Sequence, residues 1–175
     1  MLAIFSDTHS TGGHHLEGAA LEAAREADAV VHAGDFTTVE TLEAFRSLCP
    51  VFYPVHGNAD NVTVTEQLPP VRIVDCEGIR IAVTHRRDGG DVGLAMFGRS
   101  READVVVSGH THRPSVVDAE GVLLLNPGSH AQPRGNRPGF ATLERGKDGT
   151  VRGELREPDG TLLESFALER ENRSE

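Results

Sequence analysis

The sequence contains little lysine, few cysteines and no long apolar run. Lys147 is the single lysine, and the 17 lysine and arginine residues are outnumbered by 27 aspartate and glutamate residues, which gives a formal net charge of -10. A surface of this charge repels the phosphate backbone of nucleic acids at long range, so nucleic acid is not an expected partner. A phosphate-bearing substrate would need positive charge concentrated at one place.

The two cysteines, Cys49 and Cys76, have no metal-type spacing and are too few for a disulfide framework, which is typical of a reducing compartment. No segment approaches the roughly 18 consecutive apolar residues of a membrane span. The N-terminal segment MLAIFSDTH also lacks the basic flank and cleavage site of a signal peptide. We therefore expect a cytoplasmic protein with no membrane partner.

The length of 175 residues and the hydrophobic content of 38% are sufficient to bury one core. No linker, repeat or low-complexity segment interrupts the sequence, so residues 1–170 are predicted to form a single domain. The polar end of the chain, residues 171–175, is predicted to fray.

Short apolar runs alternate with helical periodicity in the first third of the chain. Strands are predicted over 1–6, 28–33 and 51–56, with a helix in each interval and a capping box formed by Thr37 and Glu40. Later come two strands joined at Glu77–Gly78, a helix over 91–101, a strand over 104–108 and several hairpins. The predicted fold class is therefore α/β (α+β), a two-sheet β-sandwich flanked by helices.

Polar side chains follow five of the predicted strands at the point where each strand ends. They are Asp7 and His9, Asp35, Asn58 and Asp60, His85, and His110 and His112. In open α/β sheets, the carboxyl ends of the strands share one edge, and the loops there form the binding site. Five segments are thus predicted to bring carboxylates, an amide and imidazoles to one rim.

The spacing and type of these residues favour a metal site. Residues two apart on an extended chain point to the same side, so Asp7 with His9, and His110 with His112, are predicted chelating pairs. Imidazole, carboxylate and amide ligands without thiolate suit manganese, iron, cobalt, nickel or zinc in a site that is not a structural zinc site. Each motif alone also fits a simple turn, whereas the ordered set favours metal binding.

The ordered motifs SDTH, GD, GNAD, TH and GHTH resemble those of the calcineurin-like metallophosphoesterases, in particular the small single-domain YfcE-type phosphodiesterases. The later segment NPGSHAQPRGNRPGFATLE is similar to that subgroup as well, so the resemblance extends from residue 1 to about residue 145. The family fold is a sandwich of two sheets flanked by helices, in agreement with the pattern above.

This resemblance implies two divalent cations, with manganese expected and nickel, iron, cobalt or zinc as alternatives. One cation would be held by Asp7, His9, Asp35 and His112, and the other by Asp35, Asn58, His85 and His110. The resemblance implies a phosphodiesterase in which a hydroxide that bridges the metals attacks phosphorus in line. The expected catalytic residues are Asp35, Asn58, His85 and Asp60, and Asp60 is expected to orient a site histidine.

The sequence departs from the family pattern in two places. Many relatives have a histidine, thought to protonate the leaving group, where this chain has Ala59, so we expect good leaving groups to react much faster than alkyl esters. Arg86 and Arg87 stand where relatives usually have Gly-His. These two arginines and Arg134 are candidate substrate contacts, with solvated loop positions as the alternative.

The remaining histidines are predicted to have supporting roles. His32 is expected to be buried near the site, His14 and His15 to begin the first helix, His56 to be structural, and His130 to be a candidate for reaching the site. The segment Asn126–Ser129 is expected to form a tight bend that shapes one wall.

Two other functions remain as alternatives to the enzyme. The retromer subunit with this fold works mainly as a protein scaffold, but it has lost several ligands that this sequence keeps. A nuclease would need a basic groove, which Arg86, Arg87, Arg99 and Arg101 would have to supply. The resemblance also implies that the chain self-associates as a homo-oligomer, with a small phosphodiester as its substrate.

Overall fold

The computed structural model describes residues 1–168. In chain order the elements are β1 (Leu2–Phe5), α1 (Gly18–Glu26), β2 (Ala29–His32), α2 (Val39–Arg46), β3 (Phe52–Pro54), α3 (Val62–Gln67), β4 (Val71–Cys76), β5 (Ile79–Thr84), α4 (Gly90–Arg99), β6 (Val105–Val107), β7 (Ser115–Asp118), β8 (Leu123–Asn126), β9 (Phe140–Arg145), β10 (Val151–Arg156) and β11 (Leu162–Leu168). The expected frayed tail lies outside the described residues.

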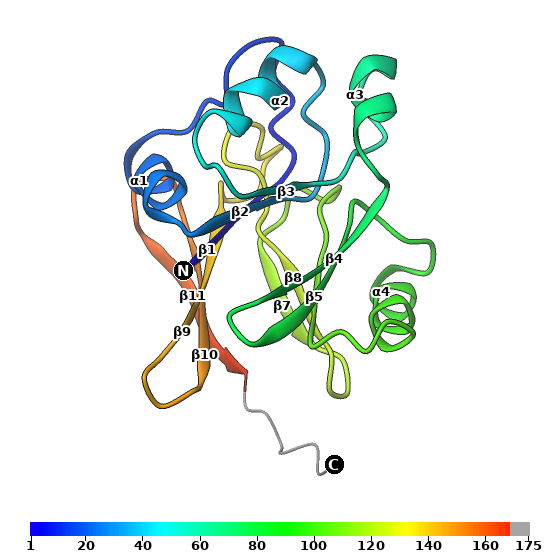
Figure 1. Ribbon diagram of the computed structural model, residues 1–175, viewed down its shortest axis with the longest axis vertical. Helices are drawn as coiled ribbons and strands as arrows, with labels where there is room; N and C mark the ends of the chain where they lie inside the picture. The colour runs from blue at the N-terminus through cyan, green and yellow to red at the C-terminus, as the bar shows by residue number, and fades with distance from the viewer. Residues whose placement is uncertain (169–175) are drawn as a thin grey trace.

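Two mixed sheets face each other. The first has the strand order β11-β10-β9-β1-β2-β3, and the second has the order β4-β5-β6-β8-β7. Strands β1, β2 and β3 are parallel to one another, as are β5, β6 and β8, while the remaining strands pair antiparallel. Helices α1 and α4 lie on opposite outer sides of the pair of sheets (Figure 1). The predicted two-sheet sandwich flanked by helices is confirmed.

The alternation of side chains along the strands builds a core in three layers. On β1, Leu2 and Ile4 face the other sheet, whereas Ala3 and Phe5 face the helices α1 and α2. On β6, Val105 and Val107 face inward and Val106 packs under α4. Both faces of these strands are buried, which is why the sequence shows continuous apolar runs there.

Two details of the helices differ from the sequence prediction. Helix α2 is capped by Thr38, whose side chain accepts from the Thr41 N–H, and not by Thr37. Thr37 has a φ of 85°, and its own N–H donates to Asp60 Oδ1 at 2.7 Å, so it is held outside the helix. Helix α3 was not predicted, although Asn61 caps it through a bond from the Val64 N–H.

The first helix begins later than expected. His14 and His15 precede α1, and His15 has a φ of 53°, a left-handed conformation that a helix does not accept. Ala20 and Ala24 form the buried face of α1, and their small side chains let the helix lie close to the sheet. Within residues 1–168, no helix has the length and apolar character needed to cross a bilayer.

Candidate metal centre

The carboxyl ends of all six parallel strands converge at one edge of the sandwich. The loops after β1, β2 and β3 carry Asp7 and His9, Asp35, and Asn58; those after β5 and β6 carry His85, and His110 and His112. The structure therefore brings together all seven predicted ligands, which come from five loops that follow parallel strands of two different sheets. They form two neighbouring groups, in each of which the donor atoms of three residues lie within 4.8 Å of one another.

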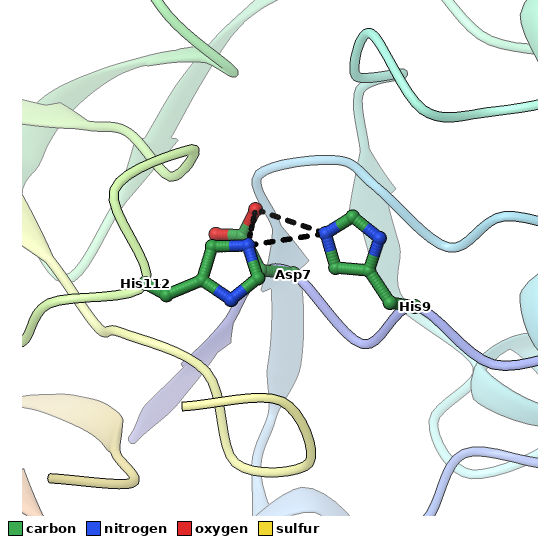
Figure 2. A group of neighbouring side chains, drawn as sticks. All are labelled: Asp7, His9 and His112. Atoms are coloured by element: carbon green, nitrogen blue, oxygen red, sulfur yellow. Dashed lines mark hydrogen bonds and ion pairs between the residues drawn. The ribbon is translucent and has the colours of Figure 1, made fainter. Parts of the chain in front are cut away.

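The first group consists of Asp7, His9 and His112 (Figure 2). The Nε2 atoms of the two histidines are 3.2 Å apart, and they lie 3.7 Å and 3.5 Å from Asp7 Oδ1. Figure 2 shows both rings turned with a nitrogen toward the same carboxylate. Three donors thus point at one small volume.

The second group consists of Asp35, His85 and His110, joined by Asn58. Asn58 Oδ1 lies 3.0 Å from His85 Nε2 and 3.0 Å from His110 Nδ1, and His85 Nε2 lies 3.2 Å from Asp35 Oδ2. The amide oxygen therefore completes a set of one carboxylate, one amide and two imidazoles.

Asp35 connects the two groups. Its Oδ2 atom lies 3.3 Å from His9 Nε2 in the first group and 3.2 Å from His85 Nε2 in the second. Its other oxygen, Oδ1, accepts from the Ala59 N–H at 2.8 Å, which fixes the orientation of the carboxylate. Asp35 Oδ2 therefore lies between the two sets of donors, where a ligand shared by two cations would be placed.

Hydrogen bonds to backbone carbonyls select the protonation of two ring nitrogens. His85 Nδ1 donates to Ala33 O at 2.8 Å, and His112 Nδ1 donates to Gln132 O. Because these Nδ1 atoms carry a proton, the Nε2 atom of each ring is the one that faces the centre and would give its lone pair to a metal once the ring is neutral.

The donor set fits a pair of cations. Two ligand atoms that each lie about 2.1 Å from one ion are about 3.0 to 3.4 Å apart in octahedral or tetrahedral geometry. The distances of 3.2, 3.5 and 3.7 Å within the first group are close to this range without any rearrangement. A set of carboxylate, amide and imidazole ligands that lacks thiolate suits a divalent transition metal.

The electrostatics of the centre also favour a cation. Hydrogen bonds from His9 to Asp35 and Asp7 raise the pKa of His9 to about 9, although burial alone would lower it. Burial would raise the pKa of Asp35, but its hydrogen bonds with His85 and His9 outweigh burial and hold that pKa well below its usual range. The carboxylates therefore attract positive charge strongly at this point.

The backbone of the ligand loops is left-handed at five of the seven ligands. The φ angles are 55° at Asp7, 44° at His9, 63° at Asp35, 72° at His110 and 59° at His112. The extended chelating pairs expected from the two-residue spacing do not occur, so that part of the prediction is wrong. Sharp left-handed turns, which non-glycine residues adopt only when the surroundings hold them there, bring both members of each pair to the centre.

Two glycines allow the loops to approach the carboxylates. A methyl group on Gly109 would overlap Ser6 Oγ and lie 2.7 Å from Asp7 Oδ2, and one on Gly57 would overlap Asp35 Oδ1. The glycine of GHTH also lets the next residue's N–H, that of His110, donate to Asp7 Oδ2 at 2.9 Å. Both loops depend on the absence of a side chain at these positions.

Asp60 does not orient a histidine, contrary to expectation. Its carboxylate accepts from three backbone N–H groups, those of Gly57 at 2.7 Å, Thr37 at 2.7 Å and Asp35 at 3.1 Å. These bonds occupy both oxygens, so Asp60 ties the loop after β2 to the loop after β3. It thereby holds Asp35 beside Asn58.

The Asn126–Ser129 segment supports the ligands in a way that the sequence did not reveal. Ser129 Oγ donates to Asp7 O at 2.7 Å and accepts from the Gln132 N–H at 2.8 Å. Asn126 Nδ2 donates to Gly109 O at 2.9 Å and to Thr111 Oγ1 at 3.0 Å. The only signal in the sequence was the position of this segment at the end of an apolar run.

The other histidines lie away from the donors or behind them. His32 is fully buried, lies 2.9 Å from Thr8 Oγ1 and accepts from the Gly34 N–H, so it joins the first two ligand loops from behind, as predicted. His130 is buried against Phe5 and donates to His14 O, and it does not reach the ligands. His56 is half-buried beside Gly57.

The three candidate arginines differ in their surroundings. Arg86 and Arg87 line two cavities beside the ligands, but the Arg87 guanidinium lies 4.2 Å from the centroid of the Phe97 ring, on which Arg101 also stacks at 4.0 Å. Arg134 is exposed in the segment that follows His130. Arg99 donates to Ala119 O and pairs with Glu120, so the four arginines of the nuclease alternative do not form one groove.

The fold and the centre together define a metallophosphoesterase-type domain. The sequence agrees with this class, because residues 1–148 match the calcineurin-like phosphoesterase superfamily domain. The chain belongs to the calcineurin-like phosphoesterase superfamily.

Individual relatives and structures agree with this assignment. A probable metallophosphoesterase of Methanothermobacter thermautotrophicus is 33% identical over 82% of this chain and 84% of its own length. A phosphodiesterase of Methanocaldococcus jannaschii is 25% identical over 73% of this chain and 82% of its own length. The crystal structure of Vps29 from Entamoeba histolytica complexed with zinc has a TM-score of 0.76 at 21% identity, covers 96% of this chain and 99% of that one, and shows the likeness of fold.

Proposed function

We propose that this protein is a cytoplasmic phosphodiesterase that depends on two divalent cations, with manganese as the expected metal. The observation that carries the proposal is the position of Asp35 Oδ2, which is 3.3 Å from His9 Nε2 and 3.2 Å from His85 Nε2. The family assignment and the phosphodiesterase among the relatives support the same activity. The zinc in the Vps29 structure supports a metal on this fold.

Two bound cations would supply the concentrated positive charge for the phosphoryl group and would acidify the attacking water. Hydrolysis breaks one phosphorus–oxygen ester bond, adds the oxygen of water to phosphorus and leaves a phosphomonoester and an alcohol. Because the formal net charge of the chain is -10, the centre itself must provide the attraction for phosphate.

The residues of the chain position the reacting groups. Asp35 and Asn58 fix the relation between the two donor groups through the contacts described above, and the carbonyls of Ala33 and Gln132 hold the imidazoles in the ligating tautomer. The exposed Arg86 guanidinium is the candidate for binding a non-bridging phosphate oxygen, for which its planar donors are suited. Ala59 offers no proton for the leaving group.

The enzyme is favoured over the scaffold because all seven ligands converge. Hydrolysis of bis(p-nitrophenyl) phosphate with added Mn²⁺ tests this choice, with a chelated sample, Asp35→Asn and His110→Ala as comparisons. We expect each variant to lose more than about 100-fold in rate, since losing groups that only orient metal ligands already costs about 10–100-fold. The matched control is Asp75→Asn, an exposed aspartate on β4. Activity that survives chelation and both substitutions would refute the proposal.

A further inference from the structure

Two cavities of similar size meet at the metal centre. The first, here named the α4 cavity, has a volume of about 190 Å³ and is lined by His85 and His110 together with Leu94, Val117, Leu124 and Asn126. The second, here named the Pro70 cavity, has a volume of about 200 Å³ and is lined by Asn58, His85, His56 and Pro70. Arg86 and Arg87 line both cavities.

The boundary between the cavities lies at three ligands of the second donor group. His85 borders both cavities, His110 borders the α4 cavity, and Asn58 borders the Pro70 cavity. Since Asn58 Oδ1 is 3.0 Å from a ring nitrogen of each histidine, the two cavities open on either side of one point. A phosphate bound to a cation held by these ligands would have space on two sides.

The α4 cavity has an apolar wall and polar groups at its mouth. Leu94 of α4, Val117 of β7 and the buried Leu124 of β8 form the wall. Ser108 adds a hydroxyl group near the ligands, whereas both N–H groups of the Asn126 amide are used within the protein. Such a lining, apolar with a few polar groups, is typical of sites for small organic molecules.

The arginines define the side of the cavities that faces solvent. The Arg87 guanidinium stacks on the Phe97 ring, on which Arg101 also stacks. The Arg87 guanidinium is therefore held in place as part of the cavity wall. Within residues 1–168, no hydrogen bond or ion pair engages the guanidinium of Arg86. Arg86 is therefore the cation that remains available to a phosphate at the junction.

The volumes limit what each cavity holds. A cavity of about 150 Å³ accommodates benzene in a well-studied protein, whereas sites for drug-sized ligands have about 300–1,000 Å³. Each cavity here, at about 190 and 200 Å³, therefore has room for one ring and not for a nucleotide chain. Two ring-sized cavities fit the two organic groups of a phosphodiester, and a phosphomonoester would fill only one of them.

We propose that the two cavities receive the two ester substituents of a small phosphodiester, with a planar or apolar ring in the α4 cavity and the phosphate between His85, His110 and Arg86. This inference rests on the proposed function and names its substrate class. It distinguishes small diesters that carry one ring on each side from monoesters and from polymeric nucleic acid.

The test fills the α4 cavity with a tryptophan at its exposed rim. Val117→Trp adds a large ring inside the cavity, and the matched control Val92→Trp adds the same ring at a position on α4 that is 70% exposed and does not line the cavity. The substrates are bis(p-nitrophenyl) phosphate, which has two rings, and methyl p-nitrophenyl phosphate, which has one ring and the same leaving group. The measured quantity is the ratio of their kcat/KM values.

We expect Val117→Trp to lower the ratio of the two-ring to the one-ring substrate at least tenfold, because only the two-ring diester needs both cavities. Val92→Trp should leave the ratio within about twofold of the unmodified protein. An unchanged ratio in Val117→Trp, or an equal change in both variants, would overturn the assignment of the cavity. Absence of hydrolysis by the unmodified protein would instead refute the proposed function.

A binding measurement tests the cavity without turnover. Diphenyl phosphate is titrated into the Mn²⁺-loaded protein by calorimetry. Its Kd should rise at least tenfold in Val117→Trp and stay within twofold in Val92→Trp. Equal affinity of all three proteins would overturn the proposal whether or not the protein hydrolyses esters.

Discussion

The Ser129 hydroxyl donates a hydrogen bond to the backbone oxygen of Asp7 at 2.7 Å, across 122 residues of sequence. The same hydroxyl accepts from the N–H of Gln132, whose carbonyl holds the ring of His112. One buried serine thus supports two ligands of the first donor group from behind.

Substitution of this serine should weaken metal binding. We expect Ser129→Ala to raise the Kd for Mn²⁺ by about 10–100-fold, because contacts that orient metal ligands have effects of this size. Titration calorimetry measures the affinity, and Ser165→Ala, at an exposed position on β11, is the control. An affinity equal to that of the unmodified protein would show that the contact with Asp7 is not needed for the site.

A methyl group on the glycine before His110 should damage the centre. We expect Gly109→Ala to retain less than half of the bound metal, because the added carbon would overlap Ser6 Oγ and press on Asp7. Crowding of this kind typically costs about 1–3 kcal/mol of stability. Metal content by atomic emission and unfolding in urea are the measurements. The control is Gly12→Ala, because nothing lies within 4 Å of the carbon added at that position. Full metal content in Gly109→Ala would contradict the prediction.

The buried His130 should make stability depend on pH. Burial lowers the pKa of His130 to about 4, although the hydrogen bond from its Nε2 to His14 O acts in the opposite direction, and its Nδ1 is buried without a partner among the described residues. The unfolded chain takes up this proton near pH 6.5, so the stabilising effect of the neutral ring is present above that pH and is lost as the pH falls toward 4.

From pH 7 to pH 5, His130 should account for a loss of about 2 kcal/mol in the free energy of unfolding. His130→Phe removes this contribution while keeping a ring beside Phe5. Urea unfolding of the metal-free proteins at both pH values is the measurement, and the comparison of the two proteins cancels the other titrating groups. Equal pH dependence of the two would refute the assigned pKa.

The reaction should depend steeply on the leaving group. Ala59 supplies a backbone N–H to Asp35 but no acidic side chain, so esters of alcohols with high pKa lack a proton donor from this position. We expect Ala59→His, at an exposed site, to accelerate alkyl esters by about 10²–10⁴-fold while aryl esters change little. Rates for a series of diesters against leaving-group pKa give the slope. A flat dependence in the unmodified protein would contradict the prediction.

The succession of the first strands and helices along the chain and the candidate ligand residues could be predicted because both are local features of the sequence. Asp7, Asp35 and His110 each follow an apolar run, and parallel strands end at one edge whatever the details of packing. The helix cap was misplaced by one residue because Asp60, over 20 residues away, takes the N–H of Thr37. Patterns among neighbouring residues do not show that Asp60 will accept a hydrogen bond from Thr37.

The two-sheet sandwich and the edge at which the seven candidate ligands meet followed from the sequence, because periodicity indicates which strands are buried and because residue chemistry indicates which side chains could bind metal. The left-handed turns at Asp7 and His110 and the hydrogen bond from Ser129 to Asp7 became visible in the folded protein alone. These features depend on contacts between segments that are distant in the chain, and such contacts exist only once both sheets have packed.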